Sequence, residues 1–287
     1  MKIDKIVWGT DGSKDSMHAL RLAEILSAKF KSRILGISVI PEYYTVVNAF
    51  PPAEKAKFHD WVEHNLITRN KESMEKIKRE LSRKEIKFDY EIIKGIPSKS
   101  ITKFAENENA DLIVLGRGRL PEQTILGGTA LKVLRTSRIP VLTVRDDKLK
   151  YTINKILVPI ALSHGLSKNF GYAMDLSREF CSMVDILNVV EVGYHHYPLE
   201  LAELLKGFAH RELQGIVGKS RITDNLDMHT VTAVNGWRGI VDFAIRKKSD
   251  LIVMSSYGEG KFKKEFIGSV SEKVIQESRC PVITMTP

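Results

Sequence analysis

The sequence predicts an α/β fold made of two tandem, doubly wound, five-stranded parallel sheets, and three observations support this prediction. The chain has 287 residues, about twice the length of one domain, for which the usual prior is about 150 residues. Three sequence patterns recur at offsets of 150, 139 and 141 residues. Short runs rich in Ile and Val alternate with segments of helical periodicity, as expected when strands of one sheet are connected by helices.

The internal repeat divides the chain into two similar units. A polar and charged connector lies near residues 146–151, so we expect domains at 1–147 and 152–287. The matching segments are 5–13 with 155–163, 111–116 with 250–255, and 132–141 with 273–282. Because each unit repeats the same order of patterns, both are expected to have the same architecture.

Each predicted strand is a continuous apolar run without polar alternation, which is typical of a parallel sheet covered on both faces. Helical periodicity predicts helices between the strands, with Pro52 at the start of the long one and Ser98 as the N-cap of the next. A stripe at Met74, Ile77 and Leu81 predicts the buried face of the long helix. The expected strands are 5–8, 33–40, 88–93, 112–115, 141–145, 155–158, 183–190, 229–234, 251–254 and 282–285; the expected helices are 13–30, 53–83, 98–107, 129–136 and 198–220.

Composition excludes several classes of protein. Hydrophobic residues make up 43% and charged residues 28% of the chain, which is typical of a globular protein and argues against disorder or a coiled coil. No apolar run approaches the roughly 18 residues of a membrane span, and the N-terminus lacks the apolar core of a signal peptide, so we expect a cytoplasmic protein with no membrane contact. Cys181 and Cys280 are too few for a disulfide framework or a zinc site, and both are interpreted as small buried apolar residues.

Positive charge is concentrated in the first unit. The net charge of +9 divides into +8 for residues 1–150 and +1 for residues 151–287. The basic residues alternate with acidic ones, as in residues 71–80, and this pattern predicts a solvated helix face. No nucleic-acid-binding motif accompanies the charge, so nucleic-acid binding is not expected.

Two loops carry the candidate chemistry. In an open parallel sheet, ligands bind beyond the carboxyl ends of the strands where the strand order reverses. The first loop, Thr10 to Ser13, places an acid in a tight turn before a helix, and the second follows the fourth strand of each unit. In the second unit the second loop runs from Ser255 through Gly258 to Gly268 and Ser269. Glycines let the backbone approach a phosphate, and amides at a helix N-terminus attract it. Three lysines of this loop either neutralise phosphate or only solvate the loop: Lys261, Lys263 and Lys264.

At these residues the sequence resembles the universal stress protein family, and specifically its tandem two-domain members. ATP-binding members share G-x-x-G, nine residues and G-[S/T], with an Asp after the first strand. The resemblance therefore implies a Rossmann-like fold, a stress response function, and a site for ATP or a related nucleotide, with Mg²⁺ as a companion ion. The implied nucleotide-binding residues are Thr10, Asp11, Val39, Leu115, Gly116, Gly118, Gly127, Gly128, Thr129, Met254, Ser255, Gly258, Gly268 and Ser269.

Neither unit carries the complete family pattern. In the first unit ten residues separate Gly116 from Gly127, against twelve between Ser255 and Gly268. One alignment puts Gly127–Gly128 in place of Gly–Ser and loses the hydroxyl, whereas another uses Gly118, nine residues and Gly128–Thr129. Both alignments stay open. In the second unit Ala161 replaces the acid.

Two arginines of the first loop have two open interpretations. Arg117 and Arg119 either bind phosphate directly or keep the loop in solvent. His195, His196 and His210 form a weak metal pattern, because adjacent residues of an extended segment point to opposite sides, and no metal site is expected. The aromatic residues after the second strand, and the apolar residues at the equivalent place in the second unit, either pack on the sheet or on the other unit, or line a pocket for a lipid-like or aromatic ligand. They include Tyr43, Tyr44, Phe50 and Phe58, with Leu204, Leu205 and Phe208 in the second unit.

These observations predict a cytoplasmic regulatory protein rather than an efficient enzyme. No nucleophile–base motif or P-loop is present, so at most weak ATP hydrolysis is expected. Nucleotide binding would control an unidentified protein partner; the alternative is a scaffold or small-ligand carrier that has lost nucleotide binding. The resemblance also implies that residues 141–145 pair with residues 282–285, so that the units form an intramolecular pseudo-dimer, with a homodimer as a further possibility.

Overall fold

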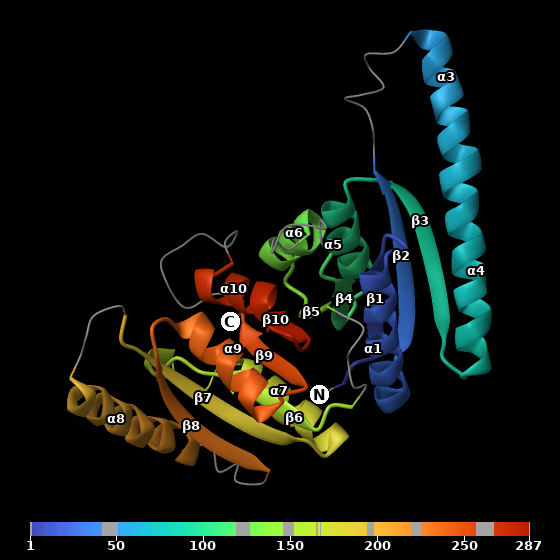
Figure 1. The fold of residues 1–287 in the computed structure, drawn as a ribbon. Helices are drawn as coiled ribbons and strands as arrows, with labels where there is room; N and C mark the ends of the chain where they lie inside the picture. Colours follow the sequence, from blue (N-terminus) through green and yellow to red (C-terminus); the bar gives the residue numbers. More distant parts are fainter. Residues whose placement is uncertain are drawn as a thin grey trace.

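One ten-stranded sheet runs through the whole molecule, with helices on both faces (Figure 1). The computed structural model describes residues 2–41, 51–118, 127–145, 152–164, 166, 168–193, 198–219, 225–256 and 267–286. Several residues singled out from the sequence lie outside these ranges: Tyr43, Tyr44, Phe50, Arg119, His195, His196, Gly258, Lys261, Lys263 and Lys264.

The strands and helices follow the predicted order. The strands are β1 Lys5–Thr10, β2 Arg33–Pro41, β3 Phe88–Gly95, β4 Leu112–Gly116, β5 Val141–Val144, β6 Lys155–Pro159, β7 Met183–Glu191, β8 Leu226–Ala233, β9 Leu251–Ser255 and β10 Val282–Met285. The helices are α1 Lys14–Phe30, α3 Pro52–Trp61, the π-helix η1 Val62–Ile67, α4 Thr68–Arg83, α5 Pro97–Asn107, α6 Gly128–Thr136, the 3₁₀ helix η2 Leu162–His164, α7 Lys168–Phe180, α8 Leu199–Gly218, α9 Gly236–Lys247 and α10 Ser269–Glu277.

The strand order is β3-β2-β1-β4-β5-β10-β9-β6-β7-β8. We call β1–β5 with their helices the N-terminal unit and β6–β10 with theirs the C-terminal unit. All pairs inside a unit are parallel, whereas β5 and β10 pair antiparallel, with Ile283 opposite Leu142. The predicted pairing of the last strands is therefore confirmed. The strand order reverses between β1 and β4 and between β6 and β9, which makes these the switch points of a doubly wound sheet.

Two hydrophobic cores cover the two faces of the sheet, and each runs through both units. One contains residues of α1, α4, α7 and α8 together with Trp8, which is fully buried. The other contains residues of α5, α6, α9 and α10, including Val133 and Val274. Alternate residues of a strand point to opposite faces, which is why the Ile- and Val-rich runs supply both cores. The predicted α/β class is confirmed.

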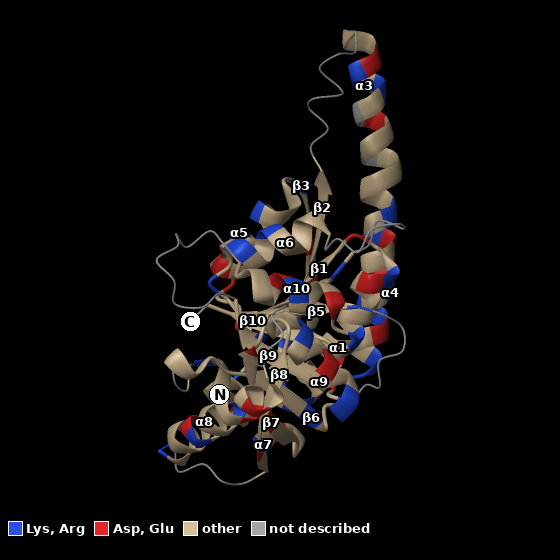
Figure 2. Cartoon of the chain, turned by 60° about the vertical axis from the view of Figure 1, so that its left-hand side comes forward, with Lys and Arg blue, Asp and Glu red and all other residues tan. Residues whose placement is uncertain are grey.

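The long helix of the N-terminal unit consists of α3, η1 and α4. The backbone stays in the right-handed helical region at Trp61 and Thr68, the two junctions, so the three segments form one continuous helix. Its α3 end projects away from the sheet (Figure 1). Met74, Ile77 and Leu81 are buried, as predicted, and blue and red segments alternate along the exposed side of α4 (Figure 2).

Two local predictions were wrong. Helix α5 begins at Pro97 with Ile96 as its N-cap, so Ser98 lies inside the first turn, where its carbonyl accepts from Thr102 Oγ1 at 3.0 Å. Proline's fixed φ suits the first helical position, which explains the earlier start. Cys181 is exposed because it occupies the left-handed position that ends α7, with φ of 55°. Among the described helices, none has the length and apolar character needed to cross a membrane.

Candidate functional site

A cavity of about 560 Å³ lies at the switch point of the N-terminal unit, beyond the carboxyl ends of β1 and β4. Its size is typical of a small-ligand site. Thr10 and Asp11 come from the end of β1, and Gly116 and Gly118 come from the end of β4 and the loop that follows it. All the residues predicted from the first unit line this cavity: Thr10, Asp11, Val39, Leu115, Gly116, Gly118, Gly127, Gly128 and Thr129.

The turn after β1 is held by its own polar side chains. The amide of Ser13 donates to Asp11 Oδ1 at 3.0 Å, and the amide of Gly12 donates to Thr10 Oγ1 at 3.1 Å. The Thr10 and Ser16 hydroxyls lie 2.9 Å apart. Short polar side chains that bond to the backbone two residues ahead fix such turns. They place the exposed carboxylate of Asp11 at the mouth of the cavity.

The end of β4 requires glycine for close packing. A Cβ added to Gly116 would lie 2.6 Å from backbone atoms of Asp15 and Ser16, a distance no real contact reaches, so a side chain here would push α1 away from the sheet. By contrast, a Cβ added to Gly128 meets no heavy atom within 4 Å. Gly116 is therefore needed for the fold, whereas Gly128 leaves open space in the cavity.

The helix starts decide between the two alignments of the shortened loop. Helix α6 begins at Gly128, and helix α10 begins at Ser269. The amide of Gly127 donates to the Arg117 carbonyl at 2.9 Å, and the amide of Gly268 donates to the Ser256 carbonyl at 2.8 Å. These equivalent contacts place Gly127 opposite Gly268 and Gly128 opposite Ser269. The hydroxyl at the first helical position is absent from the N-terminal unit, and Thr129 is the second residue of its helix.

The first turn of α6 presents backbone donors to the cavity. The first hydrogen bond inside the helix is from the Leu131 amide to the Gly127 carbonyl, 3.1 Å long. The amides of residues 128–130 precede this bond and have no partner in a regular helix. Gly128, Thr129 and Ala130 all line the cavity. Such a helix start carries partial positive charge and suits an anionic group.

Arg117 has neither of the two roles considered from the sequence. It is only 2% exposed, and its guanidinium donates to the Ser278 carbonyl at 2.8 Å, the Ser278 hydroxyl at 2.9 Å and the Cys280 carbonyl at 2.8 Å. All three acceptors belong to the C-terminal unit, so Arg117 links the two units beneath the cavity. Burial raises the pKa of the neighbouring Cys280 thiol to about 12, so the predicted buried, apolar role of Cys280 is confirmed.

Several cavity residues were missed from the sequence. The Ser38 hydroxyl donates to Asn70 Oδ1 at 3.0 Å, and Asn70 Nδ2 donates to the Leu66 carbonyl at 2.8 Å. All three line the cavity and connect β2 to the long helix. A polar residue between Ile37 and Val39 is the signal that points to Ser38. Leu66 and Asn70 carry no such signal, because their position depends on how the long helix packs.

The switch point of the C-terminal unit has a different set of groups. Met254 is buried at the end of β9, and the Ser255 carbonyl accepts from the Ser271 hydroxyl at 2.9 Å. Ser269 is exposed at the first position of α10, with Gly268 as the N-cap. Gly258 lies outside the described residues. Ala161 offers no carboxylate at the position equivalent to Asp11, which leaves this unit with the hydroxyl but without the acid.

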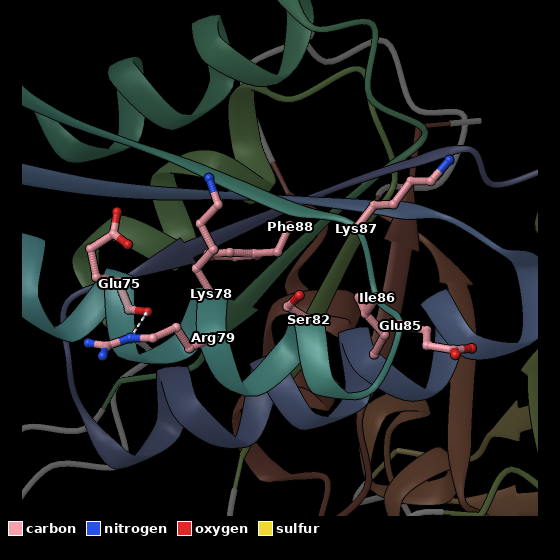
Figure 3. Close-up of a pocket in the computed structure, with 8 residues that line it drawn as sticks. All are labelled: Glu75, Lys78, Arg79, Ser82, Glu85, Ile86, Lys87 and Phe88. Atoms are coloured by element: carbon pink, nitrogen blue, oxygen red, sulfur yellow. Dashed lines mark hydrogen bonds between the residues drawn. The ribbon is translucent and has the colours of Figure 1, made fainter.

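A second hollow, of about 530 Å³, lies between the end of α4 and the start of β3 (Figure 3). Three of its charged side chains bond to neighbouring groups: Arg79 Nε donates to the Glu75 carbonyl at 3.3 Å, Lys78 Nζ donates to Asp89 Oδ1 at 3.0 Å, and Glu75 Oε1 accepts from the Tyr90 hydroxyl at 2.7 Å. The lining residues are Glu75, Lys78, Arg79, Ser82, Glu85, Ile86, Lys87 and Phe88. We therefore interpret the charged side chains of this hollow as part of the packing between α4 and β3 rather than as a ligand site.

A buried acid in the C-terminal unit was also missed. Asp185 on β7 is 5% exposed, and its Oδ1 lies 2.7 Å from His229 Nε2 on β8. Ligand atoms of Asp185, Asp227 and His229 all lie within 4.8 Å of one another. The His229 ring packs on Phe243, with centroids 4.9 Å apart, and Arg246 lies over the same Phe243 ring. Because His229 lies within hydrogen-bond distance of the buried Asp185, we interpret the group as a hydrogen-bonded pair that satisfies this carboxylate.

Known proteins resemble the chain over its whole length. The family model described as Universal stress protein family matches residues 2–145 and 152–285. A universal stress protein of Mycobacterium tuberculosis is 21% identical over 98% of this chain and 99% of its own length. Another, from Methanocaldococcus jannaschii, is 30% identical over 50% of this chain and 83% of its own length.

Solved structures show the same fold. The crystal structure of a universal stress protein from Archaeoglobus fulgidus is 19% identical, covers 99% of this chain and 97% of that chain, and has a TM-score of 0.70. A putative universal stress protein from Pseudomonas aeruginosa, 14% identical, covers 99% of this chain and 94% of that chain with a TM-score of 0.70. Because the family model matches both units, the chain belongs to the universal stress protein family.

Proposed function

We propose that the chain is a cytoplasmic, stress-related regulatory protein that binds ATP or a related nucleotide in the cavity of the N-terminal unit. The observation that carries the proposal is that all nine residues that the resemblance implies for the first unit, from four separate segments of the chain, line one cavity of about 560 Å³. Two free cysteines agree with a reducing compartment. The domain limits 1–147 and 152–287 are part of the same proposal.

The cavity supplies three kinds of contact that a nucleotide needs. Val39, Ile101 and Leu115 provide apolar surface for a base. The Asp11 carboxylate is an acceptor for ribose hydroxyls or base amines. The amides at the start of α6 provide donors for phosphate. We assign the base to the β2 side, the ribose to Asp11 and the phosphates to residues 128–130.

The same residues favour binding over catalysis. Asp11 is the one carboxylate among the described residues that line the cavity, and it already accepts from the Ser13 amide. Arg117 lines the cavity, but its guanidinium donates to carbonyls of the C-terminal unit. Mg²⁺ would arrive with the nucleotide rather than on a protein cage. Occupancy would order the loop after β4 and so control binding of a protein partner, which requires different nucleotide affinity in the two states.

Calorimetric titration with ATP, ADP and AMP, with and without Mg²⁺, tests this proposal. Asp11→Ala should weaken binding at least fivefold, because it removes an acceptor that the ligand desolvates. Gly128→Ser should strengthen binding about three- to tenfold, because its hydroxyl enters open space beside the phosphates. Ser269→Gly, the reverse exchange in the C-terminal unit, is the matched control and should leave the affinity unchanged.

A second candidate function rests on the apolar lining of the cavity. Ile40, Leu66 and Ile101 lie beside few charged groups, as suits a carrier for a small apolar or aromatic ligand. Thermal melting separates the candidates, since a nucleotide at a hundredfold excess over its Kd stabilises the fold by about 2.7 kcal/mol. A folded protein whose melting temperature no nucleotide changes would contradict nucleotide binding and favour the carrier or scaffold.

A further inference from the structure

Helix α8 has two apolar faces, but only one of them packs inside the molecule. Leu213 and Val217 are buried against the sheet. The N-terminal half of the helix carries a second apolar stripe, spaced by three and four residues, at roughly 150° around the helix from the first. Its members are Leu201, Leu204, Leu205 and Phe208, which are 38%, 53%, 39% and 54% exposed.

The exposed stripe is a concentrated feature. Five of the nine large hydrophobic side chains that are exposed among the described residues lie on α8. The helix lies at the outer side of the C-terminal unit, away from β5 and β10 (Figure 1). Contiguous exposed apolar surface of this kind marks an interaction site in most proteins. The stripe therefore needs a partner.

The order of residues along the stripe is self-complementary. Starting between Leu204 and Leu205 and moving outward, the apolar positions are Leu204 with Leu205 and then, one turn out, Leu201 with Phe208. If a second copy of the helix runs antiparallel, Leu204 faces the other copy's Leu205, and Leu201 faces its Phe208. An isologous dimer has a two-fold rotation axis, so each residue of the stripe must be compatible with its counterpart in the other copy.

Charges beside the stripe select the same orientation. Glu200 and Arg211 are exposed and eleven residues apart, about three helical turns, so they lie on the same side of the stripe. The Arg211 guanidinium stacks 4.9 Å from the centroid of the Phe208 ring, which holds it at the edge of the stripe. An antiparallel pair places Glu200 of one copy beside Arg211 of the other, twice. In a parallel two-fold pair the two Glu200 side chains would lie on opposite sides of the stripe, and neither would reach Arg211 of the other copy.

We propose that two copies of this chain associate through α8, antiparallel about a two-fold axis between Leu204 and Leu205. The occupant of the stripe is the same stripe of a second copy. This surface is separate from the β5–β10 pairing that joins the two units within one chain, and from the cavity of the N-terminal unit. The contact is small, which predicts a weak, concentration-dependent dimer.

Sedimentation equilibrium without nucleotide tests the association. The wild-type chain should show a monomer–dimer equilibrium, and Leu204→Glu should raise the dissociation constant at least tenfold, because it brings two carboxylates together at the axis. Ile245→Glu changes a residue of similar exposure, 43%, on α9 and should have no effect. A wild-type monomer at concentrations on the order of 0.5 mM, or a dimer that Leu204→Glu leaves intact, would overturn the proposal.

A charge exchange tests the orientation. Glu200→Arg and Arg211→Glu should each weaken the dimer several-fold, because each places two like-charged pairs at its edges. The double variant Glu200→Arg/Arg211→Glu restores opposite charges and should recover most of the wild-type affinity. If the double variant loses as much free energy of dimerisation as the two single variants lose together, the antiparallel arrangement is contradicted. Circular dichroism of each variant confirms that the helix remains folded.

Discussion

The N-terminal and C-terminal units share one strand order but differ in the polar groups at their switch points. The N-terminal unit has Asp11 and a glycine at position 128, where a hydroxyl is missing. The C-terminal unit has Ala161 in place of the acid and keeps the hydroxyl at Ser269. The backbone differs as well: α1 begins four residues after β1, whereas the 3₁₀ helix η2 lies between β6 and α7, and the loop after the fourth strand is two residues shorter in the N-terminal unit. Duplication of a fold therefore does not preserve two copies of a site.

The contact between the units is also unequal. Arg117, Arg135 and Arg145 of the N-terminal unit reach α10 and the turn before β10, where they donate to the groups of Ser278, Cys280, Glu272 and Gln276. The equivalent positions of the C-terminal unit are Ser256, Gln276 and Thr286, none of them cationic. Carbonyls at a helix C-terminus attract cations. Three of the arginines that contribute to the positive charge of the N-terminal unit thus stabilise its contact with the C-terminal unit.

The largest expected effect comes from breaking this unequal contact at Arg117. Arg117→Ala removes a buried cation with three hydrogen bonds and leaves the Ser278 carbonyl without the donor that Arg117 supplies, whereas the Cys280 carbonyl still accepts from the Ser278 hydroxyl. We expect a loss of about 3–5 kcal/mol in the free energy of unfolding. Urea denaturation measures it. Arg138→Ala, at an exposed arginine of the same unit, is the control and should cost less than about 0.5 kcal/mol.

Arg117→Lys sharpens the same test. The single ammonium group of lysine replaces a planar guanidinium that donates to two carbonyls and a hydroxyl. Arg117→Lys should therefore recover less than half of the free energy of unfolding that Arg117→Ala loses. Equal stability of the alanine variant and the wild type would show that the two units hold together without this contact. Unfolding in two separate steps would show that Arg117 couples them.

The second comparison concerns the paired strands at the outer edges of the sheet. Asp185 faces Asp227 across β7 and β8, whereas the N-terminal unit has Leu35 at the equivalent position, facing Asp89. His229→Ala leaves the buried Asp185 without its hydrogen-bond partner and should cost about 2–3 kcal/mol.

Asp185→Leu introduces the residue type that the N-terminal unit has at the equivalent position, Leu35, and is the counterpart of His229→Ala. It removes the buried acid together with the need for a partner, so stability should stay within about 1 kcal/mol of the wild type or rise above it. Guanidinium denaturation of both variants measures the difference. A loss for Asp185→Leu as large as that for His229→Ala would mean that the Asp–His pair itself stabilises the fold.

The fold is easier to predict from the sequence than the site. Helices and strands follow from patterns of residues that are close together in the chain, whereas the site also depends on contacts between residues that are far apart in it. The buried face of α4 follows from the local spacing of Met74, Ile77 and Leu81, and the strands follow from local Ile- and Val-rich runs. The role of Arg117 depends on Ser278, which is 161 residues away, and no local pattern reports such a contact. The glycines around the cavity were predictable from their spacing, because they serve the backbone at one strand end.

The start of α6 is not determined by the local spacing of glycines. Two alignments of the loop were equally consistent with the glycine spacing, and the equivalent hydrogen bonds of Gly127 and Gly268 decide between them. Leu66 and Asn70 reach the cavity from a helix whose tilt depends on packing. Asp185 looks like any strand residue until His229 is placed beside it.

The smallest expected effect is the difference in stability cost between substituting Asp89 on β3 and substituting Asp227, the equivalent acid on β8. Hydrogen bonds from Arg33 and then Lys78 hold the pKa of Asp89 below its usual value. In the C-terminal unit Met183 replaces Arg33, and Asp227 forms no ion pair with the described residues. A lowered pKa stabilises the fold above the unfolded-state value, about 3.9, and this stabilisation disappears as pH falls through the lower folded-state value.

Asp89→Asn should therefore cost about 0.5–1 kcal/mol at pH 7, since the Asp89 side chain is 46% exposed and solvent screens its pairs. The cost should shrink as the pH falls below about 4, because the wild-type carboxylate then becomes protonated too. Asp227→Asn is the matched substitution at an acid that has no ion pair among the described residues, and it should cost less than Asp89→Asn at pH 7. Denaturation of the three proteins at pH 7, 5 and 3 measures the difference. A cost for Asp89→Asn that does not change with pH would show that shape or packing, rather than the charge on Asp89, stabilises the edge of the N-terminal unit.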